Sequence, residues 1–185
     1  MKGNIFMIAG PSGVGKGTVV KQLMELDEKL ALSVSATTRA PREGEIDGVN
    51  YYFLTREKFE AMVAEGGFLE HAEYVGNCYG TPKQPVVDQT EKGFDVILEI
   101  EVQGCAQIME MLPEAKGIFL LPPSYKELEK RLRGRGTETE EKISKRLQTA
   151  RGEIAQAYRF DHFVINDDVD TAAGRILEII KEYRD

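Results

Sequence analysis

The stretch that decides the fold reads IFMIAGPSGVGKGTVVKQL, from Ile5 to Leu23. Its first five residues are apolar and typical of a buried strand, and apolar residues recur at helical spacing after the glycines. The glycines allow the backbone to curl, so that successive N–H groups point inward at phosphate oxygens. The N-terminus of the following helix favours the same anion, and Lys16 adds a positive charge within reach of it. The stretch therefore predicts a phosphate-binding loop between a strand and a helix.

The predicted loop consists of Gly10, Pro11, Ser12, Gly13, Val14, Gly15, Lys16, Gly17 and Thr18. In loops of this kind a serine or threonine directly follows the lysine and binds Mg²⁺ through its hydroxyl. Here Gly17 follows the lysine, so Thr18 is the candidate for direct contact with Mg²⁺. The phosphate cradle depends on backbone groups that this change leaves intact. The alternative interpretation is a glycine-rich turn that ends in a chance Gly-Lys pair.

The composition is that of a soluble globular chain. Of its 185 residues, 42% are hydrophobic and 30% are charged, which allows a full core and excludes a disordered or collagen-like chain. No apolar run approaches the ~20 residues that span a bilayer, and the stretch before Gly10 is too short for a signal peptide. Two cysteines and two histidines are too few for a zinc site or a disulfide framework. We therefore expect a cytoplasmic protein.

The net charge of −7 repels nucleic acid and anionic membranes. The arginines are nevertheless clustered at a few places, a pattern that suits a small polyanionic ligand. We expect small-molecule substrates, no nucleic acid, no membrane and no obligate protein partner.

Further buried strands alternate with helical patterns along the chain, which indicates an α/β fold with a parallel sheet flanked by helices. The strands are expected at residues 5–9, 94–100, 118–121 and 163–165. The part from about Ser35 to Pro85 is richer in aromatic residues and turn signals. We interpret it as an inserted small α+β unit with a sheet of its own.

Two helix starts are marked in the second half of the chain. Ser124 and Thr137 each precede a glutamate by three residues, which is the pattern of a capping box. From Ile143 to Ala157 apolar residues follow at helical spacing, so a long amphipathic helix is expected there. Another helix is expected from Asp168 to Tyr183.

Carboxylates end the predicted strand at residues 94–100. In open α/β sheets, ligands bind at the carboxyl ends of the strands, and this is where Glu99 and Glu101 fall. We favour Glu101 as a functional residue that faces Mg²⁺ through water. The alternative is an acidic residue that has simply reached solvent.

Two arginine clusters lie outside the loop. Arg39 and Arg42 flank Pro41 in a predicted turn, and two guanidinium groups there can clamp a second phosphate. Arg131, Arg133 and Arg135 lie between two predicted helices, where a helical hairpin can bring arginines to the transferring group. The alternatives are a solvated arginine pair and cations that offset a helix dipole. With the phosphate loop, the clusters imply two phosphorylated substrates face to face, the layout of a kinase acting on a nucleoside monophosphate.

The residues also resemble the guanylate kinase family over nearly the whole chain. The resemblance rests on seven segments in the right order: GPSGVGKGT (10–18), SATTRAPREGEIDGVNYYF (35–53), FLEHAEYVGNCYGTP (68–82), EIEVQG (99–104), RLRGRGTETEE (131–141), KRL (145–147) and INDD (165–168). It implies a P-loop NTPase core (residues 1–34, 85–123 and 156–185), an inserted GMP-binding domain (35–84) and a helical lid (124–155). The implied reaction is ATP + GMP = ADP + GDP, with Mg²⁺ and with GMP or dGMP as acceptor.

The resemblance also implies the role of individual residues. The GMP phosphate would be held by Arg39, Arg42 and Tyr51, with Tyr79 close by, and guanine would be contacted by Ser35, Glu70 and Thr81. We add Glu101 to the GMP contacts. The loop residues Gly10 to Thr18 would bind ATP, with Arg131 and Asn166 near its adenine. The catalytic residues would be Lys16, Arg39, Arg135 and Arg146.

Two other functions are compatible with parts of this pattern. Guanylate-kinase-like domains in scaffold proteins keep the fold but bind phosphopeptides, and they generally lack a working phosphate loop. An enzyme for a different phosphate acceptor would not need Glu70 and Thr81, whereas a carboxylate at residue 70 matches the adjacent N1–H and 2-amino donors of guanine.

Overall fold

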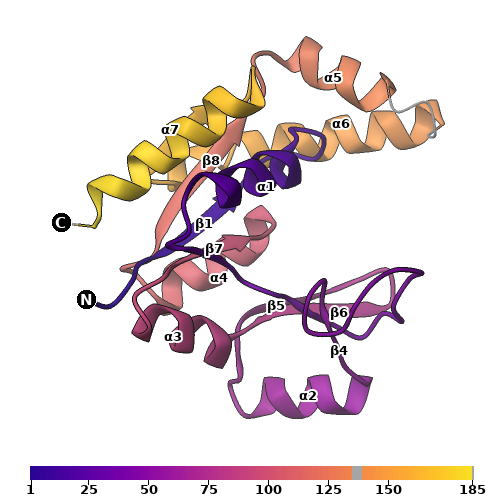
Figure 1. Cartoon of the computed structure of the whole chain (residues 1–185). Helices are drawn as coiled ribbons and strands as arrows, with labels where there is room; N and C mark the ends of the chain where they lie inside the picture. Colours follow the sequence, from indigo (N-terminus) through magenta and orange to yellow (C-terminus); the bar gives the residue numbers. More distant parts are fainter. Residues whose placement is uncertain (135–138, 185) are drawn as a thin grey trace.

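The central sheet is built around the strand that precedes the phosphate loop. Strand β1 (Ile5–Ala9) pairs with β7 (Asp95–Glu99) on one side and β8 (Lys116–Leu121) on the other. The edges are β2 (Leu30–Leu32) and β9 (His162–Ile165), so the order is β2-β7-β1-β8-β9 and all neighbours are parallel. This computed structural model describes residues 1–134 and 139–184 (Figure 1). The predicted parallel sheet is confirmed.

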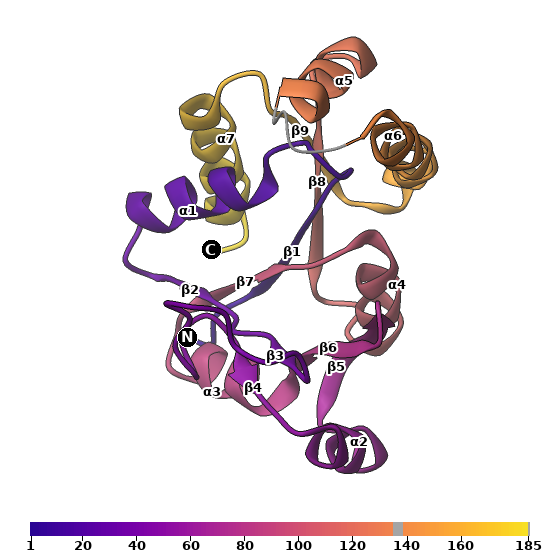
Figure 2. The same ribbon diagram turned by 90° about the vertical axis from the view of Figure 1, so that its right-hand side faces the viewer.

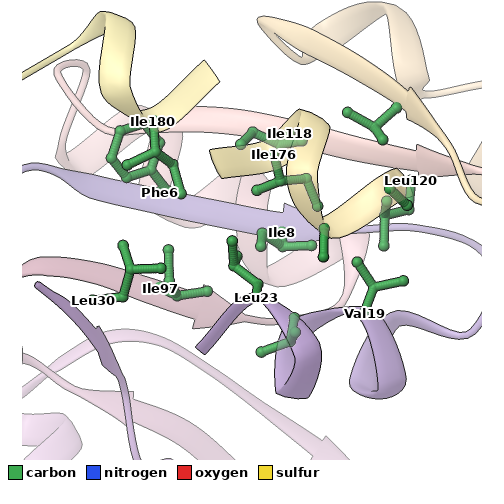
Figure 3. Close-up of a cluster of buried hydrophobic side chains, with 14 of the residues drawn as sticks. Phe6, Ile8, Val19, Leu23, Leu30, Ile97, Ile118, Leu120, Ile176 and Ile180 are labelled. Atoms are coloured by element: carbon green, nitrogen blue, oxygen red, sulfur yellow. The ribbon is translucent and has the colours of Figure 1, made fainter. Parts of the chain in front are cut away.

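One face of the sheet is covered by helices α1 (Lys16–Leu26) and α7 (Val169–Glu182), which pack against each other. Alternate residues of β1, Phe6 and Ile8, point to this face and are fully buried. Figure 3 shows the cluster, with ten of its residues labelled: Phe6, Ile8, Val19, Leu23, Leu30, Ile97, Ile118, Leu120, Ile176 and Ile180. The cluster holds the helix that starts at the phosphate loop firmly on the sheet.

The other face is covered by α3 (Lys83–Glu91) and α4 (Val102–Met111). The remaining residues of β1, Met7 and Ala9, belong to this second core cluster. Because both faces are buried, β1 is apolar at every position and the middle residues of β7 and β8 are apolar as well, without the alternation of a half-exposed strand.

A second, smaller sheet forms from residues between 36 and 82, with the order β4-β3-β6-β5. Its strands are β3 (Ala36–Thr37), β4 (Tyr52–Phe53), β5 (Phe68–Tyr74) and β6 (Asn77–Pro82). Helix α2 (Arg56–Ala64) packs against it through a separate small core of Ala36, Phe59, Phe68 and Cys78. Figures 1 and 2 place this sheet on one side of the central sheet and helices α5 and α6 on the opposite side.

Helices α5 (Tyr125–Gly134) and α6 (Glu140–Ile154) form a pair with its own apolar contact of Leu128, Leu132, Ile143 and Ala150. The predicted cap at Ser124 is confirmed, since its Oγ accepts from the Glu127 N–H at 3.1 Å. The predicted cap of the second helix is wrong. The helix begins at Glu140 and Thr139 is its N-cap, accepting from the Lys142 N–H. The sequence alone is ambiguous, because Thr137 and Thr139 both lie near this helix start. The packing of Ile143 on α5 favours the start after Thr139. A short 3-10 turn (Ala157–Arg159) follows α6.

The two sheets are joined at the contact of α4 with β5. The side-chain amide of Gln107 on α4 accepts from the His71 backbone N–H at 3.2 Å and donates to the His71 carbonyl at 3.1 Å. This pairing gives the edge strand β5 a hydrogen-bond partner on the central layer. Within the described ranges, none of the helices is both long and apolar enough to cross a membrane.

Candidate active site

The phosphate loop lies at the carboxyl end of β1 and lines a cavity of about 440 Å³. The residues that line this cavity are Gly10 to Thr18 together with Glu99 and Glu101. Gly13 and Gly15 have φ angles of 88° and 93°, a left-handed conformation that side chains rarely adopt. Gly15 is also the N-cap of α1, so the curled backbone leads directly into a helix N-terminus. The curled loop and the helix N-terminus that an anion cradle requires are therefore present.

Lys16 is the first residue of α1, lines this cavity and contacts the residues that follow β7. Its Nζ donates to the Ile100 carbonyl at 2.9 Å and lies 3.7 Å from Glu101 Oε1. The Glu101 side chain is 75% exposed, so the ion pair is screened by solvent and weak. Lys16 can thus turn from these partners toward a phosphate at small cost. Glu101 is the N-cap residue of α4 and lines the cavity, as its predicted position at the carboxyl end of β7 requires, and its functional role stays a prediction.

Glu99 reaches the loop more closely than we predicted. A Cβ built on Gly17 would lie 3.4 Å from Glu99 Oε1, so the glycine after the lysine stands directly beside a carboxylate. Thr18 and Glu101 line the same cavity. Among the described residues no group of three or more His, Cys, Asp or Glu side chains forms a closed metal site. A hydroxyl and two carboxylates beside a phosphate cradle nevertheless fit Mg²⁺, which is usually held by one or two carboxylates, water and substrate phosphates.

Two of the predicted site residues, Arg131 and Asn166, donate hydrogen bonds to the Val14 carbonyl. Arg131 Nη1 donates to it at 3.3 Å and also to the Asn166 carbonyl at 3.0 Å. Asn166 Nδ2 donates to the Val14 carbonyl at 2.7 Å. Asn166 is 3% exposed, and its Oδ1 has no hydrogen-bond partner in the described structure. A buried acceptor without a partner costs free energy, so it marks a position suited to a ligand donor.

Helix α6 contacts the loop through Ser12. Arg146 donates to the Ser12 Oγ from Nε at 3.1 Å and from Nη2 at 2.9 Å. The Ser12 backbone N–H donates to Glu153 Oε2 at 3.1 Å, and burial raises the pKa of the Glu153 carboxyl. The predicted catalytic residue Arg135 lies outside the described residues. Arg133 pairs with Glu129 and Glu140, so it stabilises the helix pair itself.

Arg39 is the centre of a second cationic site, on the smaller sheet. Its Nη1 and Nη2 both donate to the Glu45 carboxylate, at 2.9 and 2.8 Å, and Glu45 also accepts from the Arg42 backbone N–H at 2.7 Å. This pairing lowers the pKa of Glu45 from 4.5 to about 2. The guanidinium carbon of Arg39 lies 5.4 Å from the centre of the Tyr51 ring, whose own neighbour is Tyr79 at 6.4 Å between ring centres.

The predicted guanine residues meet where β5 and β6 pair. Thr81 Oγ1 donates to Glu70 Oε1 at 2.7 Å, and burial raises the pKa of the Glu70 carboxyl. A Cβ on Gly104 would lie 2.8 Å from Glu70 Oε2, so Glu70 lies directly over the first turn of α4. Ser35 directly precedes β3 in the same sheet. The structure thus brings Glu70 and Thr81 together and sets them against the central layer.

Three residues of this region were not predicted from the sequence: Glu45, Glu153 and Gln107. Glu153 lies seven residues after Arg146, a spacing that puts both on one helix face and was a readable signal. Glu45 and Gln107 gave no such signal. Glu45 reaches Arg39 because the loop between them folds back, and Gln107 reaches His71 because the two sheets pack together.

Known proteins resemble this chain over almost its whole length. The family model described as "Guanylate kinase" matches residues 2–183. The chain belongs to the guanylate kinase family.

Curated members of the guanylate kinase family are similar over almost their whole length. The guanylate kinase of Synechocystis sp. is 52% identical over 182 residues, which cover 98% of this chain and 95% of the relative. That of Halalkalibacterium halodurans is 54% identical over 179 residues, covering 97% of this chain and 88% of the relative. The crystal structure of guanylate kinase from Anaplasma phagocytophilum is 35% identical and has a TM-score of 0.77, covering 99% of this chain and 87% of that chain. The family and fold predictions are confirmed.

Proposed function

We propose that this protein is an enzyme that transfers the γ-phosphoryl group of ATP to GMP, giving ADP and GDP. The observation that carries the proposal is the pair of separate anion sites. One is the lysine-bearing phosphate loop, and the other is the Arg39 cluster on the smaller sheet. A hydrolase needs only the first site, whereas transfer between two phosphorylated nucleotides needs both.

Catalysis in this scheme is positioning and charge stabilisation. The GMP phosphate is already an anionic nucleophile, so no general base is required. Lys16 and Arg146 are assigned to the transferring group, because both contact the phosphate loop or its floor. Arg135 is assigned the same role by resemblance. Arg39 exchanges Glu45 for the GMP phosphate, with Arg42, Tyr51 and Tyr79 as further contacts.

Guanine is assigned to the site of Glu70 and Thr81, with Ser35 beside it. A carboxylate accepts from the N1–H and the 2-amino group of guanine together, whereas adenine presents a lone pair at N1. The hydrogen bond from Thr81 orients the Glu70 carboxylate and uses one lone pair of Oε1, so that both oxygens can still accept from the base. Selection by buried polar groups is strong because the wrong base leaves them without partners.

The adenine of ATP is assigned to the neighbourhood of Asn166 and Arg131. The buried Asn166 Oδ1 is suited to accept from the amino group of adenine. Arg131 donates to two backbone carbonyls here, so its guanidinium is already fixed where it can pack on a base.

Mg²⁺ is expected to bind with the ATP phosphates, held by Thr18 and by Glu99 or Glu101 through water. When bound, it neutralises phosphate charge in the transition state. The three parts given above, the core, the GMP-binding domain (35–84) and the lid (124–155), are proposed to close over both nucleotides and exclude water. We place the reaction in the cytoplasm, where ATP and GMP are available, with GMP or dGMP as the small-molecule acceptor.

A coupled assay of ADP formation tests the proposal. Purified protein with MgATP is given GMP, dGMP, AMP, UMP or CMP in turn, and we expect turnover selective for guanine nucleotides. The Lys16→Met variant should lose about 10³-fold in kcat while GMP binding, measured by calorimetry, stays within about threefold.

The other outcomes are equally distinct. Turnover with a different acceptor would overturn the guanine assignment and leave the kinase assignment standing. A folded protein that binds GMP without turning it over would favour the binding-module interpretation.

A further inference from the structure

Ser12 of the phosphate loop is held from two sides by one helix. Arg146 donates two hydrogen bonds to its hydroxyl, at 3.1 and 2.9 Å, and Glu153 accepts one from its backbone N–H at 3.1 Å. The two side chains are seven residues apart on α6. They therefore lie on the same helix face, separated by about 10 Å along the axis.

The place of Glu153 is unfavourable for a carboxylate. Burial disfavours its charged form and raises its pKa, and the negative charge of Glu101 adds to this, while the hydrogen bond from the Ser12 N–H and the charge of Lys16 partly compensate. The triphosphate expected in this loop would add further repulsion. The printed contact that offsets this cost is the hydrogen bond that Glu153 accepts from the Ser12 backbone N–H.

Glu153 is not among the described residues that line the loop cavity, although Ser12 is. It thus holds the loop from outside the space for phosphate, and it does not occupy the place of the anion. Helix α6 packs on α5 through an apolar contact and therefore moves as a rigid element. A hydrogen bond near the end of α6 thus restrains the position of the whole helix.

From these contacts we propose that Glu153 is a positioning residue, which anchors α6 to the Ser12 backbone and thereby sets where Arg146 lies over the phosphate loop. This inference rests on the phosphoryl transfer proposed above. Arg146 acts on the transferring group, and Glu153 acts through Arg146 without touching either nucleotide.

Three substitutions separate anchoring from charge. Glu153→Ala removes the acceptor and should lower kcat about tenfold or more, because a misplaced catalytic group costs up to about 10²-fold. The KM for GMP should stay within about twofold. Glu153→Gln keeps an oxygen that accepts from the Ser12 N–H, so its kcat should lie within about threefold of wild type. Glu153→Asp keeps the charge but is one methylene shorter, and should be as slow as the alanine variant.

A double-mutant cycle with Arg146→Ala tests the coupling. If Glu153 acts through Arg146, adding Glu153→Ala to the Arg146→Ala protein should lower kcat by less than about threefold further. The proposal would be overturned if Glu153→Ala lowered kcat by the same factor in the wild type and in Arg146→Ala. It would also be overturned if Glu153→Asp were fully active. Glu141→Ala, at an exposed position on the same helix, is the matched control and should leave kcat unchanged.

Hydrogen exchange provides a readout that needs no turnover. The peptide that contains Ser12 should exchange faster in Glu153→Ala and Glu153→Asp than in wild type or Glu153→Gln, because the N–H loses its acceptor. Unchanged exchange in the alanine and aspartate variants would overturn the anchor. An inactive wild-type protein with the expected exchange pattern would instead contradict the proposed function and leave the anchor intact.

Discussion

Glu70 shows how one side chain combines burial with a task that needs charge. Its carboxyl is held by the Thr81 hydroxyl at 2.7 Å, and burial raises its pKa. To accept from both guanine donors it must be ionised. Below the raised pKa it is protonated and loses an acceptor, so GMP binding weakens as the pH falls through that value.

The Glu70→Gln variant tests this. Its KM for GMP should rise about 10–100-fold, since a hydrogen bond to a charged group contributes about 1.5–3 kcal/mol. The ratio of variant to wild-type KM should shrink at acid pH, because only the wild type titrates at this position. The second ionisation of the GMP phosphate, near pH ~6, affects both proteins alike. A ratio that stays constant as the pH is lowered to 4.5, the ordinary pKa of a glutamate, would contradict the role of the charge.

Glu45 is the opposite case, a carboxyl whose charged form is favoured. The Arg39 guanidinium lowers its pKa from 4.5 to about 2. Because the folded pKa is the lower one, the stabilisation from this pair is complete above pH 4.5 and is lost as the pH falls toward 2.

Carbon-13 NMR of the Glu45 carboxyl should give a midpoint near 2 in the wild type. In Arg39→Gln the main cause of the shift is gone, so the midpoint should move up toward its ordinary value of 4.5. The same midpoint in both proteins would mean that Arg39 does not hold Glu45 in solution.

Among the elements, the contact of α4 with β5 places the smaller sheet on the larger one. It depends on a glycine, since a Cβ at Gly104 would lie 2.8 Å from Glu70 Oε2 and 3.3 Å from Glu70 Cγ. The Gln107 amide, which pairs with the His71 backbone, holds the same contact one turn further along. The geometry of the guanine site thus depends on how closely a helix approaches a strand.

Gly104→Ala should therefore displace Glu70 and raise the KM for GMP about tenfold, with the KM for ATP unchanged. Gly174→Ala on α7 is the matched control, because nothing lies within 4 Å of the Cβ that it adds. It should leave both KM values unchanged and raise the free energy of unfolding by about 0.5–1 kcal/mol. Equal KM values for GMP in both variants would contradict the close contact.

For the molecule as a whole, the residues after α7 are tied to the start of β7, at the end of the central sheet opposite the phosphate loop. Arg184 donates from Nε to Asp95 Oδ2 and from Nη1 to Asp27 Oδ2, each at 2.6 Å. The Asp95 side chain is 5% exposed, and its other oxygen accepts from the backbone and side chain of Asn4. One arginine thus joins the ends of α1 and α7 to β7.

Arg184→Gln should lower the free energy of unfolding by about 2 kcal/mol, because it leaves the buried Asp95 charge without its cation. Urea denaturation measures this. Arg175→Gln, which removes an exposed pair with Glu178 on α7, should change stability by less than about 0.5 kcal/mol. A similar small effect for both would show that the C-terminal pair contributes little in solution.

Much of this architecture was readable in the chain. The strands at β1, β7, β8 and β9 fell on short apolar runs, because a strand buried on both faces is apolar throughout. The edge strand β9 was expected to be buried, but Phe163 and Ile165 are exposed, since no further strand or helix among the described residues covers that face of the edge. The start of α6 was misplaced by two residues, because the choice between two threonines depends on how Ile143 packs on α5. Domain boundaries and residue roles stay predictions, with Arg135 outside the described residues.

By itself, then, the sequence determined the phosphate loop, the parallel sheet and the chemical types of both anion sites, because these depend on local conformation and on periodicity. Only the tertiary structure decided which groups meet: Glu45 on Arg39, Glu153 on Ser12, and Glu70 over Gly104. Such pairings depend on the relative placement of elements far apart in the chain. Packing between the elements determines that placement, and a local sequence pattern does not predict it.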